Sequence, residues 1–184
     1  MILFYILLAV IVILAFWAVA IYNSLVRNRN MVKEGWSGIE VQLKRRADLI
    51  PNLIETVKGY MGHERGVLEK VTELRAQSEK IAEVGEKGRV EGMLGAALGK
   101  LIAVAENYPD LKASKNFQDL QAQLAAIEEQ IQMARRYYNG TARDFNIAVE
   151  SFPGNIVAGM FRFITVEYFE IEEAADRAVP QVKF

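Results

Sequence analysis

Few side chains in this sequence are of the types that catalyse reactions or bind metals. The chain contains one histidine, His63, and no cysteine. His63-Glu64 matches half of a zinc-protease helix motif, but catalytic zinc is held by three protein ligands, and this chain offers one imidazole and no thiolate. We therefore interpret His63 as a solvated turn residue and predict no metal site, no cofactor and no enzyme activity.

The remaining motifs and the charge balance narrow the function further. The sequence has no glycine-rich phosphate loop after a strand and no serine nucleophile elbow, so we predict no small-molecule substrate. Its formal net charge is -1, whereas nucleic-acid binding typically uses a basic stripe interleaved with aromatic residues. We therefore predict no nucleic-acid partner, and we expect the protein to act by assembling with proteins or lipids.

The densest basic cluster is Lys44-Arg45-Arg46. Near a bilayer this cluster could hold anionic headgroups, at about 1 kcal/mol per charge. Arg45 and Arg46 also interrupt an otherwise apolar helical stripe, which favours ion pairs with carboxylates. The candidate carboxylates belong to Glu128, Glu129 and Asp144. A solvated helix face is the third interpretation, and the pattern leaves all three open.

The basic cluster belongs to a dense motif that runs from Trp36 to Leu53. The polar residues of this motif exceed what a helical core needs. We therefore predict that Trp36, Lys44, Arg45 and Arg46 contact a partner protein or lipid.

Small residues recur at steps of three and four in a later segment, at Gly88, Gly92, Gly95, Gly99 and Ala103. This spacing lets helices approach closely. Because each helical glycine costs about 1 kcal/mol relative to alanine, repeated use indicates close packing within or between subunits. A flexible loop in the first half of the segment fits the pattern nearly as well.

Aromatic residues concentrate near the C-terminus, at Phe152, Phe161, Phe163, Tyr168 and Phe169. Arg162 and Glu167 lie among them, and each charge would cost about 3 kcal/mol at the centre of a membrane helix, so we predict no second span. The aromatic segment could fill the core, lie on the membrane surface or form a subunit interface. As the oligomer interface we predict Phe161, Phe163, Tyr168, Phe169, Gly95 and Gly99.

The N-terminal segment 1–24 is predicted to be a transmembrane anchor. No charged side chain occurs from Met1 to Tyr22, a length that spans about 33 Å as a helix. Basic residues follow the apolar run and none precedes it, which predicts the N-terminus outside and the C-terminal domain in the cytoplasm. A cleaved signal peptide is the alternative, but the basic n-region is missing and the apolar run is too long.

Helical periodicity dominates the rest of the chain, 25–184, which we assign to one domain. Apolar stripes predict a long helix through residues 32–61, in which Pro51 either starts a new helix or causes a kink. They also predict helices over 67–81, 92–107 and 155–178, with residues 85–88 as a link. A heptad seam predicts one long helix from Ala113 to Ala148. The fold class is all-α: an antiparallel four-helix bundle with long helices, preceded by one N-terminal transmembrane helix.

Short motifs are spread over nearly the whole chain: Tyr22-Asn23, Trp36-Ser37, Val41 to Leu53, Glu55 to Tyr60, His63-Glu64, Glu106 to Lys112, Tyr138-Asn139, Ser151 to Pro153 and Tyr168-Phe169. In this order they resemble the signature of the LemA family. The resemblance implies a bacterial or archaeal inner-membrane protein with one span, the N-terminus outside, a four-helix bundle and no enzyme activity. The segment from Gly85 to Gly99 is richer in glycine than the family pattern.

Two functions fit this sequence. In the first, the chain self-assembles into a homo-oligomeric scaffold that organises or remodels the lipid bilayer. In the second, it is a membrane-tethered adaptor that recruits another membrane protein, such as a protease or a transporter.

Overall fold

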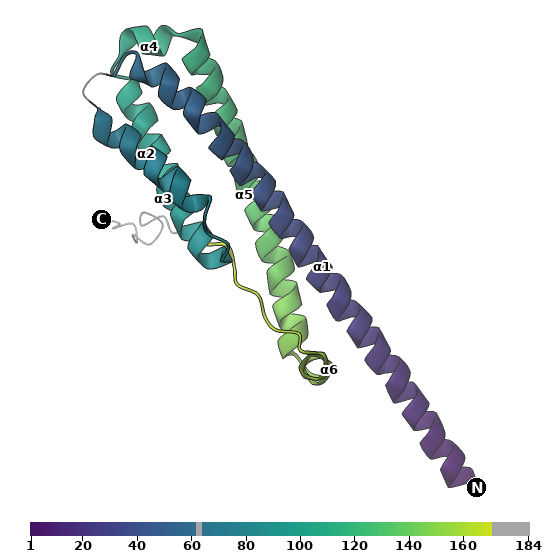
Figure 1. The fold of residues 1–184 in the computed structure, drawn as a ribbon. Coiled ribbons are helices and arrows are strands. Elements are labelled where there is room, and N and C mark those ends of the chain that lie inside the picture. Colours follow the sequence, from purple (N-terminus) through teal and green to yellow (C-terminus); the bar gives the residue numbers. More distant parts are fainter. Residues whose placement is uncertain (62–63, 171–184) are drawn as a thin grey trace, which may run out of the picture. The chain divides into compact units, whose positions relative to one another are not determined.

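The computed structural model describes residues 1–61 and 64–170 of the chain. Its helices are α1 (Ile2–Lys58), α2 (Arg65–Ser78), α3 (Val84–Ala105), α4 (Pro109–Ala113), α5 (Lys115–Glu150) and α6 (Gly154–Phe161) (Figure 1). No strand occurs among the described residues. The all-α prediction is therefore confirmed.

The chain divides into two compact units, which we describe separately. The first unit comprises residues 1–38 and 136–167, and the second comprises residues 39–135 together with the described residues 168–170. Because α1 and α5 are long, each of them contributes residues to both units.

The second unit is the antiparallel bundle that the sequence predicts. Its part of α1, then α2, α3 and its part of α5 run alternately in opposite directions, and α4 joins α3 to α5 (Figure 1). The core contains Ile50, Val57, Val71, Leu74, Leu94, Leu101, Leu111 and Phe117. Burying each such side chain contributes about 1.5–3 kcal/mol.

In the first unit, α5 packs closely against α1. A Cβ added at Gly35 would lie 3.1 Å from the Tyr138 Cα, so the absence of a side chain at residue 35 permits this approach. The rings of Trp36 and Tyr138 lie beside this contact, with centroids 5.6 Å apart. Leu25, Val32 and Phe145 are also buried in this unit.

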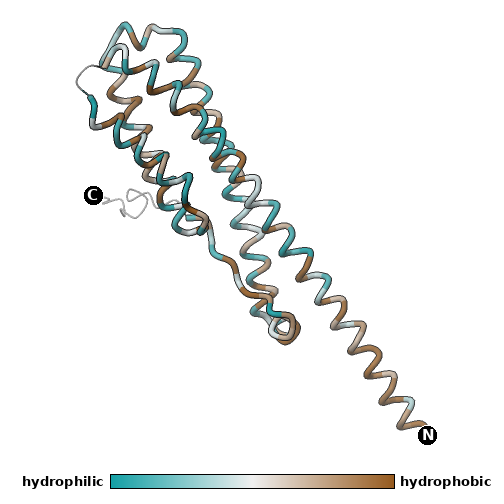
Figure 2. The backbone as a smooth tube through the Cα atoms, in the orientation of Figure 1, coloured by the Kyte–Doolittle hydropathy of each residue, from teal (hydrophilic) through white to brown (hydrophobic). Residues whose placement is uncertain are grey.

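The N-terminal part of α1 is apolar and has no protein around it. Its residues form the long hydrophobic stretch at the N-terminus in Figure 2. Among the described residues, α1 is the one helix long and apolar enough to cross a membrane, and its apolar window is 0% buried. A core helix of a soluble protein would have this surface covered.

α1 continues through Pro51 as one helix. Of the two alternatives that the sequence leaves open at Pro51, the start of a new helix is excluded. Proline has no N–H, so the carbonyl of Ala47, four residues earlier, loses its usual helical partner. Arg75 of α2 supplies a replacement, because its Nε donates a hydrogen bond of 2.9 Å to the Ala47 oxygen.

The predicted start of the third helix is corrected. α3 begins at Val84, so residues 85–88 are helical rather than a link. Gly88 is buried, and a side chain there would collide with the backbone of Glu170, which confirms close packing at this glycine.

The predicted helix over 155–178 is wrong beyond residue 161. α6 ends at Phe161 because Arg162 adopts a left-handed conformation, with φ 57°. The Phe163 N–H donates to the Ala158 oxygen at 2.9 Å, which closes a Schellman-type cap. Residues 163–170 are not helical, and residues 171–178 of the prediction lie outside the described residues.

A double-mutant cycle tests the compensation at Pro51. Arg75→Met removes the hydrogen bond to Ala47 and should lower the free energy of unfolding by about 1 kcal/mol. In a Pro51→Ala background the loss should be smaller, because the alanine N–H then serves the Ala47 oxygen. Arg75 also pairs with Glu79 at 3.0 Å, but both backgrounds lose that pair, so it cancels. Equal losses measured by urea unfolding in both backgrounds would contradict the compensation.

Candidate functional site

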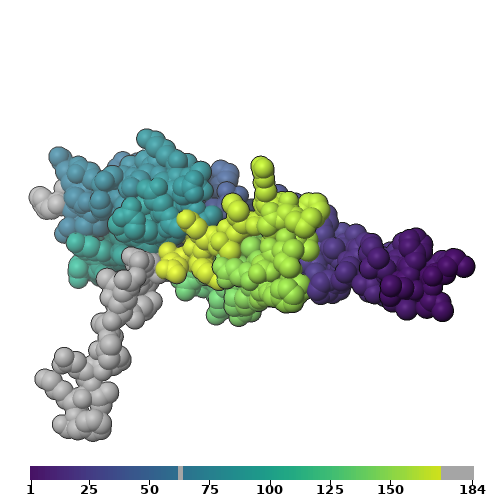
Figure 3. Space-filling view, turned by 90° about the horizontal axis from the view of Figure 1, so that it is seen from below, coloured from purple at the N-terminus to yellow at the C-terminus, as the bar shows by residue number. Residues whose placement is uncertain are grey.

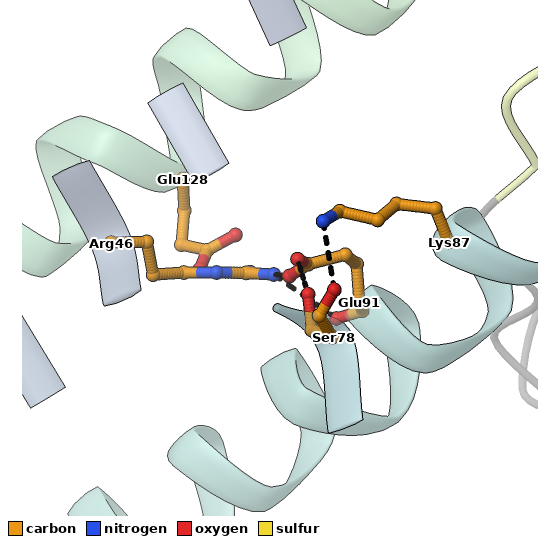
Figure 4. A network of polar contacts seen from close by, with 5 residues as sticks. All are labelled: Arg46, Ser78, Lys87, Glu91 and Glu128. Carbon is orange, nitrogen blue, oxygen red and sulfur yellow. Dashed lines mark hydrogen bonds and ion pairs between the residues drawn. The ribbon is translucent and has the colours of Figure 1, made fainter. Parts of the chain in front are cut away.

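The second unit contains a buried ionic network centred on Arg46 (Figure 4). Only 1% of Arg46 is exposed. Its Nη2 pairs with a carboxylate oxygen of Glu91 and also donates to the Glu91 backbone oxygen at 3.2 Å. Its Nη1 pairs with Glu128 at 2.6 Å. One guanidinium from α1 thus joins α3 and α5.

α2 enters the same network through its last residue. The Ser78 hydroxyl donates to the second carboxylate oxygen of Glu91. Lys87 donates from its Nζ to the Ser78 backbone oxygen at 2.8 Å. Figure 4 shows these side chains converging from four helices. The network therefore links every long helix of the bundle at one level.

The electrostatics keep Arg46 charged. Burial by itself lowers the pKa of the Arg46 guanidinium, but the carboxylates of Glu128 and Glu91 outweigh that effect, so the pKa lies above its ordinary value. Two carboxylates face one guanidinium, and the Glu128 side chain is partly exposed, so water shares the excess negative charge. The buried Arg46 Nε has no hydrogen-bond partner.

An open cleft of about 330 Å³ reaches the network from the surface. Its lining includes Lys44, Asp48, Ser78, Lys87 and Glu91. Ser78 and Glu91 form a hydroxyl–carboxylate pair, but both side chains are buried and Arg46 already holds the carboxylate. The described residues also contain no group of three or more His, Cys, Asp or Glu residues that could hold a metal. The arrangement is suited to holding helices together.

Comparison with known sequences identifies the family of this chain. The profile of the LemA family matches residues 35–184. The chain belongs to the LemA family. The match covers the second unit and the residues of the Arg46 network.

Named relatives of this LemA-family chain include two kinds of protein. Protein LemA of Metamycoplasma hominis is 30% identical over 153 residues, covering 82% of this chain and 69% of that protein. Magnetosome protein MamQ of Magnetospirillum gryphiswaldense is 24% identical over 189 residues, covering 88% and 70%. Magnetosome protein MamQ 2 of Paramagnetospirillum magneticum is 24% identical over 200 residues, covering 94% and 74%. With α1 able to cross a bilayer, this LemA-family chain is a membrane-associated protein.

The three members of the basic cluster have different surroundings. Arg46 is buried, which corrects its assignment to a lipid or partner contact, and it pairs with Glu128, one of the three candidate carboxylates of an interpretation that the sequence left open. Lys44 is exposed and pairs with Asp48 at 3.5 Å. Arg45 is also exposed, so contact of Lys44 and Arg45 with lipid or protein stays a prediction. Trp36 is half-buried against Tyr138.

The residues predicted for the oligomer interface also differ in exposure. Phe163 and Phe169 are buried inside the chain, which corrects their assignment, whereas Phe161 and Tyr168 are exposed. The Phe163 ring lies 5.8 Å from the ring of Tyr22 and 4.9 Å from the Arg29 guanidinium carbon.

Gly95 and Gly99, the two glycines predicted for the interface, also differ in exposure. Gly95 is half-buried, and a Cβ added there would lie 3.6 Å from Arg46 Nη1. Gly99 is exposed, with open space around it. An interface role therefore stays a prediction for Gly99, Phe161 and Tyr168, while Gly95 lies beside the ionic network.

Sequence reasoning missed Glu91 and Ser78 as partners of Arg46. A signal for Glu91 exists, because it follows Val90 directly and Leu94 and Leu98 continue the same buried stripe of α3. An acidic residue at the edge of such a stripe needs a cation, and Arg46 interrupts a stripe in the same way. Ser78 carries no comparable signal, since its position depends on where α2 ends.

We predict that the Arg46 network stabilises the bundle. Arg46→Leu leaves the Glu91 carboxylate buried without its cation, and such a change costs about 3–5 kcal/mol of unfolding free energy. Arg45→Leu is the matched control: it removes an exposed arginine one residue earlier and should change stability by about 0.5 kcal/mol or less. Urea unfolding of the full chain in detergent, followed by circular dichroism, measures both.

A compensating variant separates charge from packing. Arg46→Leu combined with Glu91→Leu removes both buried charges and should recover much of the loss, because no unpaired ion then remains in the core. If Arg46→Leu were no more harmful than Arg45→Leu, the network would not stabilise the bundle.

Proposed function

We propose that this chain is a single-pass inner-membrane protein whose helical domain self-assembles into a homo-oligomeric scaffold that organises or remodels the bilayer. The role is non-catalytic. Its N-terminus lies outside, and its domain lies in the cytoplasm. Arg27, Arg29 and Lys33 directly follow the apolar part of α1, and basic residues favour the cytoplasmic side of a span.

The outer face of α5 carries the self-assembly proposal. Tyr137 is 46% exposed and Ile147 is 54% exposed. Gly140 lies between them on the same face of the helix, because residues 137, 140, 144 and 147 follow the alternating three- and four-residue spacing of a helix seam. The remaining position of this face is the exposed Asp144, which pairs with Arg143 at 2.9 Å. A Cβ at Gly140 would meet nothing within 4 Å. A small residue flanked by exposed apolar side chains suits the close approach of another helix, and a second copy of α5 supplies a complementary face.

Two further observations support a structural role over a catalytic one. The charged groups of the Arg46 network bind one another and leave no side chain poised for a substrate. MamQ relatives carry the name of a magnetosome protein, which assigns them to a cellular structure and not to a reaction.

The mass of the full-length chain in mild detergent tests the proposal. One copy has a mass of 20.7 kDa, and light scattering should report a discrete particle several times larger. Tyr137→Glu with Ile147→Glu should release single copies without loss of helicity, because two carboxylates added beside Asp144 would repel the same face of a second copy.

Gln123→Glu with Gln130→Glu is the matched control, since it places the same added charge on exposed positions of α5. The control should keep the large particle. A single-copy mass for the unaltered chain would contradict the scaffold and favour the adaptor, which crosslinking in native membranes would then test by recovering the recruited protein.

Topology has its own test, which the absence of cysteine makes simple. Ile2→Cys should react with a membrane-impermeant maleimide in intact cells, because the N-terminus lies outside. Lys100→Cys, on an exposed position of α3, should react only after the membrane is permeabilised. Labelling of Lys100→Cys in intact cells would reverse the proposed orientation.

A further inference from the structure

α6 and its flanks leave an unusual number of large apolar side chains uncovered. Phe152 is 77% exposed, Met160 is 73% exposed and Ile164 is 78% exposed. Ile156 and Phe161 are more than half exposed. Several large apolar side chains exposed on one short segment are typical of an interaction site. We call these five residues the α6 patch.

The helix that carries the α6 patch is apolar both on its buried side and on its exposed side. Val157 and Ala158 are buried and attach α6 to the first unit. Ile156 and Met160 lie one turn apart on the opposite side and are exposed. The helix is therefore held to the protein by one side and presents an apolar side outward.

Contacts with α1 place the α6 patch at the end of the apolar span. The Phe161 ring lies 4.7 Å from the ring of Tyr22, and Tyr22 is the last residue before the polar part of α1. Tyrosine at such a position settles at the level of the lipid headgroups. Figure 3 shows the yellow-green surface next to the purple surface of α1. Phe161 of the patch therefore lies close to the depth of Tyr22.

Arginines lie next to the α6 patch on its own segment and on α1, and the acidic residues Glu150 and Glu167 lie just outside that segment. From Phe152 to Val166, Arg162 is the one charged side chain. Arg27 and Arg29 follow Tyr22 on α1, and all three arginines are exposed. An apolar face bordered by cations is the pattern of helices that lie in the headgroup region of anionic membranes.

We propose that α6 inserts its apolar face into the leaflet where the span of α1 ends, with the acyl boundary of anionic phospholipids as its ligand. This inference rests on the proposed membrane span of α1. It adds a second membrane contact, parallel to the surface, beside the transmembrane one. Each copy then displaces lipid headgroups on one leaflet only, which is how a scaffold of many copies would bend a bilayer.

Site-directed spin labelling tests this insertion in the full chain. The chain is reconstituted in vesicles of phosphatidylethanolamine and phosphatidylglycerol, and single cysteines carry a nitroxide at Met160, at Val12 in the span and at Arg143 on the exposed surface of α5. Collisions with dissolved oxygen, relative to those with a polar nickel complex, report depth. Met160 should give a ratio several-fold above that of Arg143 and below that of Val12.

Each outcome has a distinct meaning. A Met160 ratio equal to that of Arg143, with Val12 still deep, would overturn the α6 insertion and leave the span intact. If Val12 were also in water, the proposed span itself would be wrong. A protected Met160 label that shows spin–spin coupling between copies, without raised oxygen collisions, would identify a second copy as the occupant and would likewise overturn the lipid assignment.

A matched pair of variants tests the apolar face directly. Ile156→Asp should reduce the depth ratio of a label at Ile164, because the charge lies on the inserted side. Asn155→Asp adds the same charge to the adjacent exposed residue and should leave the ratio unchanged. Equal effects of the two variants would contradict insertion through the Ile156 face.

Discussion

Arg46 carries a charge that it keeps at any physiological pH, and its side chain is almost completely removed from water. Such a charge is tolerated only where anions and hydrogen-bond acceptors surround it. In this bundle the anions come from α3 and α5, and a hydroxyl from α2 occupies the remaining oxygen of Glu91. A shift of any one helix along its axis would separate the ions and leave a charge unpaired. The network therefore sets the register of four helices whose apolar contacts alone would tolerate several registers.

The helix that contains Arg46, α1, also contains the uncovered apolar stretch at the N-terminus. One continuous helix contains an uncovered apolar stretch, the buried face against Tyr138 and the Arg46 position. Continuity requires that the interruption at Pro51 be compensated, and the hydrogen bond from Arg75 to Ala47 provides that compensation. The side chains of α1 are uncovered at its N-terminal end and packed against other helices further along, while its backbone remains one helix.

Residues 163–167, which follow α6, are not helical and are attached to α5 by side-chain hydrogen bonds. Asn146 accepts from the Val166 N–H and donates to the Val166 oxygen, both at 2.9 Å, and the Tyr138 hydroxyl donates to the Glu167 oxygen at 2.8 Å. Burial, with a smaller contribution from Glu167, raises the pKa of Tyr138 and keeps its hydroxyl protonated for this bond. Side chains of α5 thus satisfy the backbone of Val166 and the carbonyl of Glu167, and the Phe163 ring packs in the core beside Phe145.

Local periodicity was sufficient to predict the all-α class and the long helix containing the heptad seam, because both depend on residue type at a fixed spacing. The end of α6, the helicity of residues 85–88 and the inward position of Phe163 and Phe169 were decided by tertiary structure. At Arg162 a left-handed cap stops a helix that the apolar pattern would continue, and at Gly88 a second segment fills the space that a side chain would need. Whether an aromatic ring lies in a core or on a surface depends on what packs over it, and that neighbour comes from elsewhere in the chain. Arg46 is a similar case: ion pairing was one of three interpretations open in the sequence, but its burial and the choice of Glu91 depended on the folded register of α3.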